Sequence, residues 1–186
     1  TPFDDIINES KKQNVDLIVM GSQGVSDFEE MFVGSNTEKV VRHWDIHVLV
    51  IKNEIEDFKI KNIVFASIFN TGAKETFKKI ISFLTIFDAK IHLLKVNTAQ
   101  NFEPTIKSQL KIKSFIKGAQ LENYTVNIHN DNSVEKGILN FAKYSDADLI
   151  TLNTHGRRGL MNFFNGSISK DISNHSVRPV ITFKLT

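Results

Sequence analysis

The sequence has 186 residues, 41% hydrophobic and 24% charged, with a formal net charge of +2, which is typical of a globular protein with one or two small domains. It contains no cysteine, so disulfides, thiol catalysis and cysteine metal sites are excluded. The lysines form no basic block, and no apolar run approaches the roughly 18 residues of a membrane span. We therefore expect a cytoplasmic protein with neither a nucleic-acid nor a membrane partner.

Residues 1–52 alternate between helical and strand patterns. After an N-terminal helical segment, the apolar run DLIVM at 16–20 predicts a buried strand. The stretch SNTEKVVRHW, which begins at Ser35, predicts a helix, and HVLVIK at 47–52 predicts a second strand. The polar segment NEIEDF at 53–58 is typical of a linker.

From residue 59 onward the alternation is longer and more regular. The predicted strands are 61–67, 90–96, 124–130, 148–152 and 179–184, and the predicted helices are 73–87, 104–117, 133–144 and 167–175. The helix over 73–87 has the clearest pattern, because Phe77, Ile81 and Leu84 lie on one face. Strands that alternate with helices indicate right-handed crossovers and a mostly parallel sheet covered on both faces.

The chain repeats itself without gaps between about residue 5 and residue 52. The matching pairs are DLIVMGSQG (16–24) with DLITLNTHG (148–156), Gly34-Ser35 with Gly166-Ser167, and HVLVIK (47–52) with PVITFK (179–184). Only the second copy is preceded by further strands and helices, in residues 59–136. We therefore expect residues 1–52 to be the C-terminal half of a first domain, 53–58 a linker and 59–186 a complete second domain. The chain is then expected to be part of a longer tandem protein.

A glycine pattern follows the first strand. Gly21, Gly24, Gly34 and Ser35 form G-x2-G-x9-G-S between a predicted strand and a predicted helix. Ligands of open parallel sheets collect at the carboxyl ends of strands, and glycine lets the backbone approach a ligand without a Cβ in the way. The N-terminus of a helix favours an anion, and Ser35 offers a hydroxyl to a phosphate. The residues alone leave two alternatives open: a phosphate-binding loop, or glycines that only form turns before a serine that only caps a helix.

The segment DLIVMGSQG…VGSNTEKVVRHWDIHVLVIK resembles the C-terminal half of a universal stress protein domain, and the resemblance covers essentially the whole chain. It implies an α/β fold with an open, five-stranded parallel sheet of order 3-2-1-4-5 and helices on both faces, of the Rossmann-like, adenine nucleotide alpha hydrolase-like type. It also implies binding of ATP, with Mg, or of AMP by some members. The implied binding residues are Met20, Gly21, Gly24, Gly34, Ser35 and Asn36.

The second copy departs from this pattern at two positions. Gly156, Gly166 and Ser167 match the motif, but Asn153 replaces its first glycine, and we expect the asparagine side chain to crowd a ligand. In the family a carboxylate after the first strand contacts the nucleoside, and here Ile68 in FASIFN stands in its place. We therefore expect weak or absent nucleotide binding at this second site, at a cost of about 1–3 kcal/mol for unpaired ligand groups.

Several catalytic patterns are absent from the sequence: the P-loop, the dinucleotide fingerprint, metal-ligand spacing and a nucleophile–base pair. We expect no catalytic residue and no metal site, although slow hydrolysis of bound ATP is not excluded. The leading hypothesis is a non-catalytic regulatory module in a stress response, adenine-nucleotide-binding or nucleotide-degenerate. The alternatives are a structural dimerisation module without ligand, and a weak ATP-hydrolysing or adenylyl-transferring enzyme of a related fold.

The strands HVLVIK and PVITFK are both apolar and are equivalent under the repeat. An exposed strand edge favours pairing, because its N–H and C=O groups otherwise lack partners. We therefore predict that residues 48–51 and 180–183 run antiparallel, within the chain as a pseudo-dimer or between two copies as a homodimer. The other open edge, at DLIVM, is then expected to be covered by another molecule or by a separate N-terminal fragment of the first domain.

Overall fold

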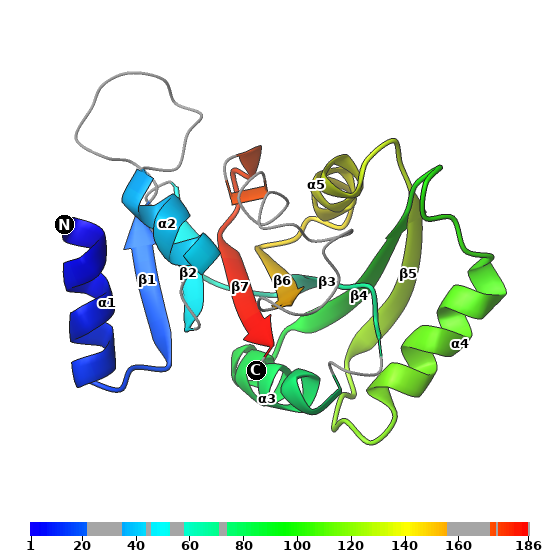
Figure 1. Cartoon of the computed structure of the whole chain (residues 1–186). Coiled ribbons are helices and arrows are strands. Elements are labelled where there is room, and N and C mark those ends of the chain that lie inside the picture. The colour runs from blue at the N-terminus through cyan, green and yellow to red at the C-terminus, as the bar shows by residue number, and fades with distance from the viewer. Residues whose placement is uncertain are drawn as a thin grey trace.

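The structure is a computed structural model that describes residues 1–21, 35–43, 46–52, 58–70, 74–155, 172–173 and 175–185. The strands are β1 (Leu17–Gly21), β2 (His47–Ile51), β3 (Asn62–Ala66), β4 (Lys90–Asn97), β5 (Tyr124–Asn130), β6 (Leu149–His155) and β7 (Val180–Leu185). The helices are α1 (Pro2–Lys12), α2 (Ser35–His43), α3 (Lys74–Leu84), α4 (Thr105–Ile116) and α5 (Val134–Tyr144). In this part of the chain the strands form a 7-stranded sheet of order β1-β2-β7-β6-β3-β4-β5 (Figure 1).

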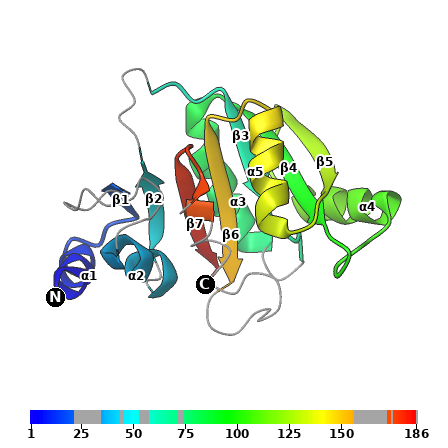
Figure 2. The same ribbon diagram turned by 90° about the horizontal axis from the view of Figure 1, so that it is seen from above.

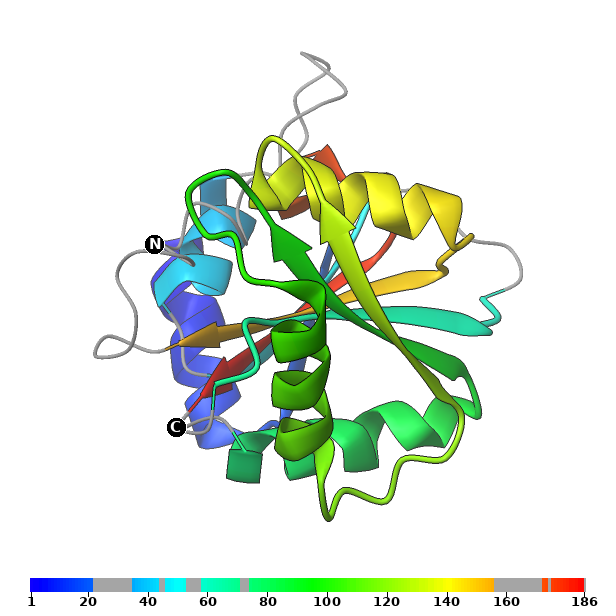
Figure 3. The same cartoon turned by 90° about the vertical axis from the view of Figure 1, so that its right-hand side faces the viewer.

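The strands from β3 to β7 form a parallel sheet with helices on both faces. β3 lies between β4 and β6, β5 extends the sheet beyond β4, and β7 extends it beyond β6. Counted along the chain from β3, this is the order 3-2-1-4-5. Figure 3 shows α5 on one face of the sheet and α3 and α4 on the other. The α/β fold class expected from the sequence is therefore confirmed.

Phenylalanine rings fill the core between the sheet and α3 and α4. The ring of Phe77 in α3 lies 5.2 Å from that of Phe65 in β3 and 4.7 Å from that of Phe115 in α4, measured between centroids. Phe69, in the loop after β3, also contacts Phe115, at 5.4 Å. Tilted and edge-on rings at such distances add to the stability that burial provides. The rings thus hold the loop after β3 against both helices.

The elements α1, β1, α2 and β2 form the N-terminal part of the sheet. β1 and β2 run parallel, from the pair Leu17 and His47 to the pair Gly21 and Ile51. The two helices lie on the same side of these strands (Figure 2). There Ile7 of α1, Val40 of α2 and Val48 of β2 are buried in one cluster. Helices thus pack on one face of β1 and β2, within the described residues.

β2 joins this part to the rest of the sheet by running antiparallel to β7, with Val48 opposite Thr182 and Val50 opposite Val180. The predicted antiparallel pairing of 48–51 with 180–183 is confirmed, within the chain. β1 lies at the edge of the sheet, and the side chain of Val19 is 58% exposed. The expectation that another molecule covers this edge stays a prediction.

Most element boundaries lie within two residues of those expected, and the differences have local causes. The helix expected over 73–87 ends at Leu84, because the chain tightens into a 3-10 turn before Asp88 takes a left-handed conformation with φ 49°. Gly21 is the last residue of β1 rather than the first residue after it. Of the helix expected over 167–175, the structure describes residues 172, 173 and 175, which are helical. None of the described helices has the length and apolar character needed to cross a membrane.

Candidate functional site

The first candidate site lies at the carboxyl end of β1. The hydroxyl of Thr37, in the first turn of α2, donates a hydrogen bond of 3.1 Å to the carbonyl of Gly21. A Cβ added at Gly21 would meet no atom of the described residues within 4 Å, apart from its own neighbours in the chain. The strand end and the start of the following helix therefore meet beside open space, which a side chain at Gly21 would partly fill.

The other residues expected at this site have mixed positions. Met20 is partly buried and packs against the cluster of α1 and α2, so its side chain already has protein neighbours. Ser35 is the first residue of α2, and Asn36, which follows it, is half-buried. Gly24 and Gly34 lie outside the described residues.

Sequence reasoning did not single out Thr37, the residue that ties the helix to the strand. The signal was present, because Thr37 stands two residues after Ser35 in the first turn of a predicted helix. A hydroxyl at such a position is normally assigned to local capping. Only the fold shows that it reaches 16 residues back along the chain to a backbone carbonyl.

The second candidate site contains Asn153, near the carboxyl end of β6. Its side chain is 1% exposed, and among the described residues neither the amide oxygen nor the amide nitrogen has a hydrogen-bond partner. An unsatisfied buried amide costs about 1–3 kcal/mol, so this group has spare capacity for a water or a polar ligand atom. Gly156, Gly166 and Ser167 lie outside the described residues.

Strand alternation shows which way Asn153 faces. Leu152 belongs to the core on the α5 side of the sheet, whereas Leu149 belongs to the core on the side of α3 and α4. Because successive side chains alternate between faces, Asn153 shares the face of Leu149 and of its register partner Phe183. Its amide therefore lies on the opposite side of the sheet from α5.

Ile68 lies in a tight loop after β3. The hydroxyl of Ser67 accepts a hydrogen bond of 3.1 Å from the backbone N–H of Phe69. Phe69 has a φ of 52° and is 1% exposed, so burial of its ring holds an unfavourable backbone conformation. Ile68 is thereby fixed at the carboxyl end of β3, where the family pattern places a carboxylate.

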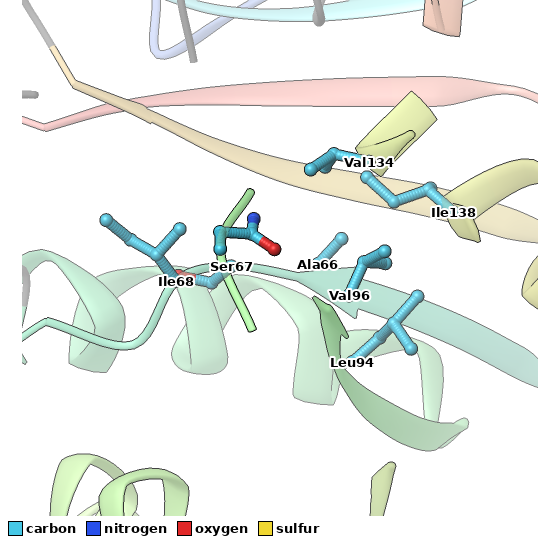
Figure 4. Close-up of a pocket in the computed structure, with 8 residues that line it drawn as sticks. Ala66, Ser67, Ile68, Leu94, Val96, Val134 and Ile138 are labelled. Carbon is cyan, nitrogen blue, oxygen red and sulfur yellow. The ribbon is translucent and has the colours of Figure 1, made fainter. Parts of the chain in front are cut away.

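A cavity beside Ile68 is very small. Its volume is about 10 Å³, and Figure 4 shows Ile68 and Ser67 at one end and Val134 and Ile138 of α5 at the other. Such a volume holds about one water molecule. The predicted weakness of the second site is consistent with this geometry, because an adenine ring needs far more room.

A carboxylate lies beside the same edge, just after β5. Asp131 accepts hydrogen bonds from the side-chain amide of Asn140, at 2.8 Å, and from the backbone N–H of Asn132, at 2.6 Å. Its carboxylate also lies 3.6 Å from the ring of His129. The hydrogen bond from Asn140, followed by that from Asn132, lowers the pKa of Asp131 below its ordinary value. Asp131 therefore helps hold the loop that leads into α5.

The fold and this edge define a class: an open, mostly parallel α/β sheet in which ligands bind at the carboxyl ends of the strands. The model of the universal stress protein family matches residues 1–52 and 59–184. The chain therefore belongs to the universal stress protein family, as the sequence motif indicated.

Comparison with individual proteins agrees with this assignment. The chain is 36% identical over 53 residues to a universal stress protein from Methanocaldococcus jannaschii, a match that covers 28% of this chain and 33% of that relative. The crystal structure of a universal stress protein from Archaeoglobus fulgidus covers 98% of this chain at 23% identity, with a TM-score of 0.72. This match covers 65% of the Archaeoglobus chain.

One further solved structure is that of a universal stress protein in complex with cAMP. It is 12% identical to this chain, with a TM-score of 0.53, and the match covers 67% of this chain and 97% of the other. At this identity the likeness concerns the fold.

Proposed function

We propose that this chain is a non-catalytic regulatory module of a stress response that binds an adenine nucleotide, AMP or ATP with Mg, at the carboxyl end of β1. The observation that carries this proposal is the space beside Gly21, which is open among the described residues, together with the hydrogen bond that brings the first turn of α2 to this residue. Family membership and the cAMP complex of a relative support an adenine nucleotide as the ligand class.

The chemistry of this proposal is that of a strand end followed by a helix. The bare backbone at Gly21 gives a flat surface for close approach of a ribose or a phosphate. The N–H groups of the first helical turn and the positive dipole end of a helix such as α2 favour the negative charge of a phosphate. Asn36, half-buried in the first turn of this helix, offers a polar side chain for the same contact.

The second site contributes little to binding under this proposal. The cavity between Ile68 and α5 has a volume of only about 10 Å³, and an isoleucine offers no hydrogen bond to a ribose hydroxyl. This closed cavity favours one alternative function for the second copy, a structural module that binds no ligand and stabilises the first copy through β7.

Isothermal titration of the full chain with AMP and with ATP, with and without magnesium, tests the proposal. We expect a binding event that Gly21→Val weakens at least about tenfold, because the added side chain occupies the surface beside the strand end. The fold should tolerate this change, because a Cβ at Gly21 meets none of the other described residues. Val19→Ala, two residues earlier on the exposed edge of β1, is the control and should bind like the wild type.

Each contrary result has a definite meaning. Absence of any heat of binding with both nucleotides would overturn nucleotide binding and favour the purely structural module. Equal nucleotide affinity of the wild type and Gly21→Val would show that the binding site does not lie at β1. Release of phosphate or pyrophosphate over many turnovers would show an enzyme and overturn the non-catalytic role.

A further inference from the structure

A much larger cavity lies beyond the tip of β4, over the first turns of α4. Its volume is about 410 Å³, which is within the usual range of small-molecule sites. Its lining includes Lys95 at the end of β4, Phe102 and Glu103 in the loop that follows, and Lys107 and Lys111 of α4. None of these residues belongs to the glycine pattern at β1 or to its repeat.

The base of this cavity is a fixed polar network around Lys95, whose side chain is 8% exposed. The Lys95 ammonium donates a hydrogen bond of 2.7 Å to the side-chain oxygen of Asn97 and lies 3.2 Å from the carboxylate of Glu103. Asn97 in turn donates to the backbone carbonyl of Glu103, at 2.9 Å. Ser108 donates to the carboxylate of Glu103, at 3.0 Å. The strand end and the start of α4 are thereby locked together, so the cavity is largely preformed.

Positive charge exceeds negative charge in this cavity. Among the described residues the lining has one carboxylate, Glu103, and it is shared between Lys95 and Lys107, the latter at 3.4 Å. Lys111 lines the same cavity and makes no ion pair with a described residue, yet it is near enough to lower the pKa of Glu103. Burial acts first to lower the pKa of Lys95, and the positive charges of Lys111 and Lys107 add to this. Three lysines around one glutamate therefore favour an added anion.

The remaining lining combines two polar residues, Asn70 and Asn101, with an apolar wall. Phe102 is 69% exposed although it lines the cavity, so one surface of its ring is available for contact. Ile68, Val96 and Pro104 complete this wall. A planar or aliphatic group against Phe102 would remove apolar surface from water. The cavity should therefore bind an anion that carries such a group more tightly than a bare anion.

We propose that this cavity is a second ligand site, which binds a small organic phosphate monoester with its phosphate near Lys107 and Lys111 and its planar part against Phe102. The N-terminal turn of α4 adds to the field that the lysines create for the phosphate. This site is distinct from the nucleotide site proposed at β1, and neither depends on the other.

Titration of the full chain with phenyl phosphate, monitored by NMR and by calorimetry, tests the proposal. Inorganic phosphate and phenol serve as the anion-only and ring-only probes. We expect phenyl phosphate to bind more tightly than inorganic phosphate and phenol to show no saturable binding. Lys111→Gln is expected to weaken the binding of phenyl phosphate roughly tenfold, which is the effect of losing one charged contact. Phe102→Ala should weaken the binding of phenyl phosphate but leave the binding of inorganic phosphate unchanged.

Matched variants separate a built site from general attraction to a basic surface. Lys113→Gln removes the same charge from an exposed position of α4 outside the cavity, and Ile106→Ala removes an exposed apolar side chain from that helix. Both should leave the affinity within about twofold of the wild type. Equal losses in Lys111→Gln and Lys113→Gln would overturn the site, and so would saturable binding of phenol or the absence of any binding. Gly21→Val should not change phenyl phosphate binding, so a failure at β1 remains distinguishable from a failure here.

Discussion

Leu49 and Ile181 lie directly opposite each other where β2 runs antiparallel to β7. Both belong to the core cluster that also contains Phe65 and Phe183, and Ile181 is 1% exposed. The pair therefore joins the N-terminal strands to the parallel sheet through buried apolar contacts as well as through backbone hydrogen bonds. Through this contact the two described strands of the N-terminal part, β1 and β2, join the larger sheet next to β7.

Ile181→Lys is expected to lower the free energy of unfolding by at least about 3 kcal/mol, because it buries an ammonium without a partner. Leu49→Lys should cost less, since Leu49 is 9% exposed and its lysine chain can reach water. Urea unfolding measures both effects. Val19→Lys on the exposed edge of β1 is the control, expected within about 0.5 kcal/mol of the wild type. If Ile181→Lys unfolds at the same urea concentration as Val19→Lys, the pairing of β2 with β7 does not stabilise the protein.

The pairing of β2 with β7 could be predicted from the sequence because these strands are apolar copies of one repeat. The ends of some helices could also be predicted, as the glycine after α4 shows. Gly118 has a φ of 85°, a conformation that favours glycine, so it ends the helix where the pattern placed the end. Ser133 likewise accepts a hydrogen bond from the N–H of Lys136, as expected of a helix cap. Such signals are local, and a single sequence contains them in full.

The unexpected features depend on contacts between distant segments. The bond from Thr37 to Gly21 and the network of Lys95 with Glu103 arise only once strands and helices are placed together. Asn153 could be identified as a departure from a motif, but its burial without hydrogen-bond partners depends on its neighbours in the sheet. The sequence therefore predicted the fold more completely than the chemistry at the carboxyl edge. Gly24, Gly34, Gly156, Gly166 and Ser167 stay predictions, since they lie outside the described residues.

Gly137 allows α5 to approach β4 closely. A Cβ at this position would lie 2.5 Å from Cγ1 of Val96 and 3.2 Å from Cβ of Asp131. Gly137→Ala is therefore expected to destabilise the protein by about 1–3 kcal/mol through overpacking, although alanine alone would stabilise a helix by roughly 0.5–1 kcal/mol.

Thermal or urea unfolding of Gly137→Ala measures this cost, and Lys136→Ala on the exposed side of α5 is the control. Adding Val96→Ala to Gly137→Ala removes the clashing methyl groups, so the two changes together should cost less than the sum of their separate effects. Stabilisation by Gly137→Ala alone, or strict additivity with Val96→Ala, would show that the helix has room to move away from the strand.

Asp131 is expected to make part of the free energy of unfolding depend on pH. Its pKa in the folded protein is lowered by its hydrogen bonds to Asn140 and Asn132, so the unfolded chain takes up a proton at a higher pH than the folded protein does. The stabilisation is present above about pH 4 and is lost as the pH falls through the lowered pKa of the folded carboxyl.

Asp131→Asn should therefore be about 1–2 kcal/mol less stable than the wild type at pH 7, and this difference should shrink as the pH approaches 2. Urea unfolding at a series of pH values gives both quantities. Glu122→Gln, at an exposed carboxylate, is the control for removing a negative charge from the chain. A difference between wild type and Asp131→Asn that stays constant from pH 7 to pH 2 would contradict this role.

Ile68→Asp combined with Asn153→Gly is expected to create a working nucleotide site in the second copy. The aspartate is shorter than isoleucine and offers an acceptor to ribose hydroxyls at the end of β3, while glycine removes the unpaired amide at the end of β6. We expect AMP affinity at this site to rise at least tenfold, since one hydrogen bond to the aspartate carboxylate is worth about 1.5–3 kcal/mol. Calorimetry in the Gly21→Val background isolates the second site from the first. Ile68→Asn provides an acceptor without charge and should give a smaller gain. If the unmodified second site already binds AMP at low micromolar concentration, Ile68 and Asn153 are not what limits it.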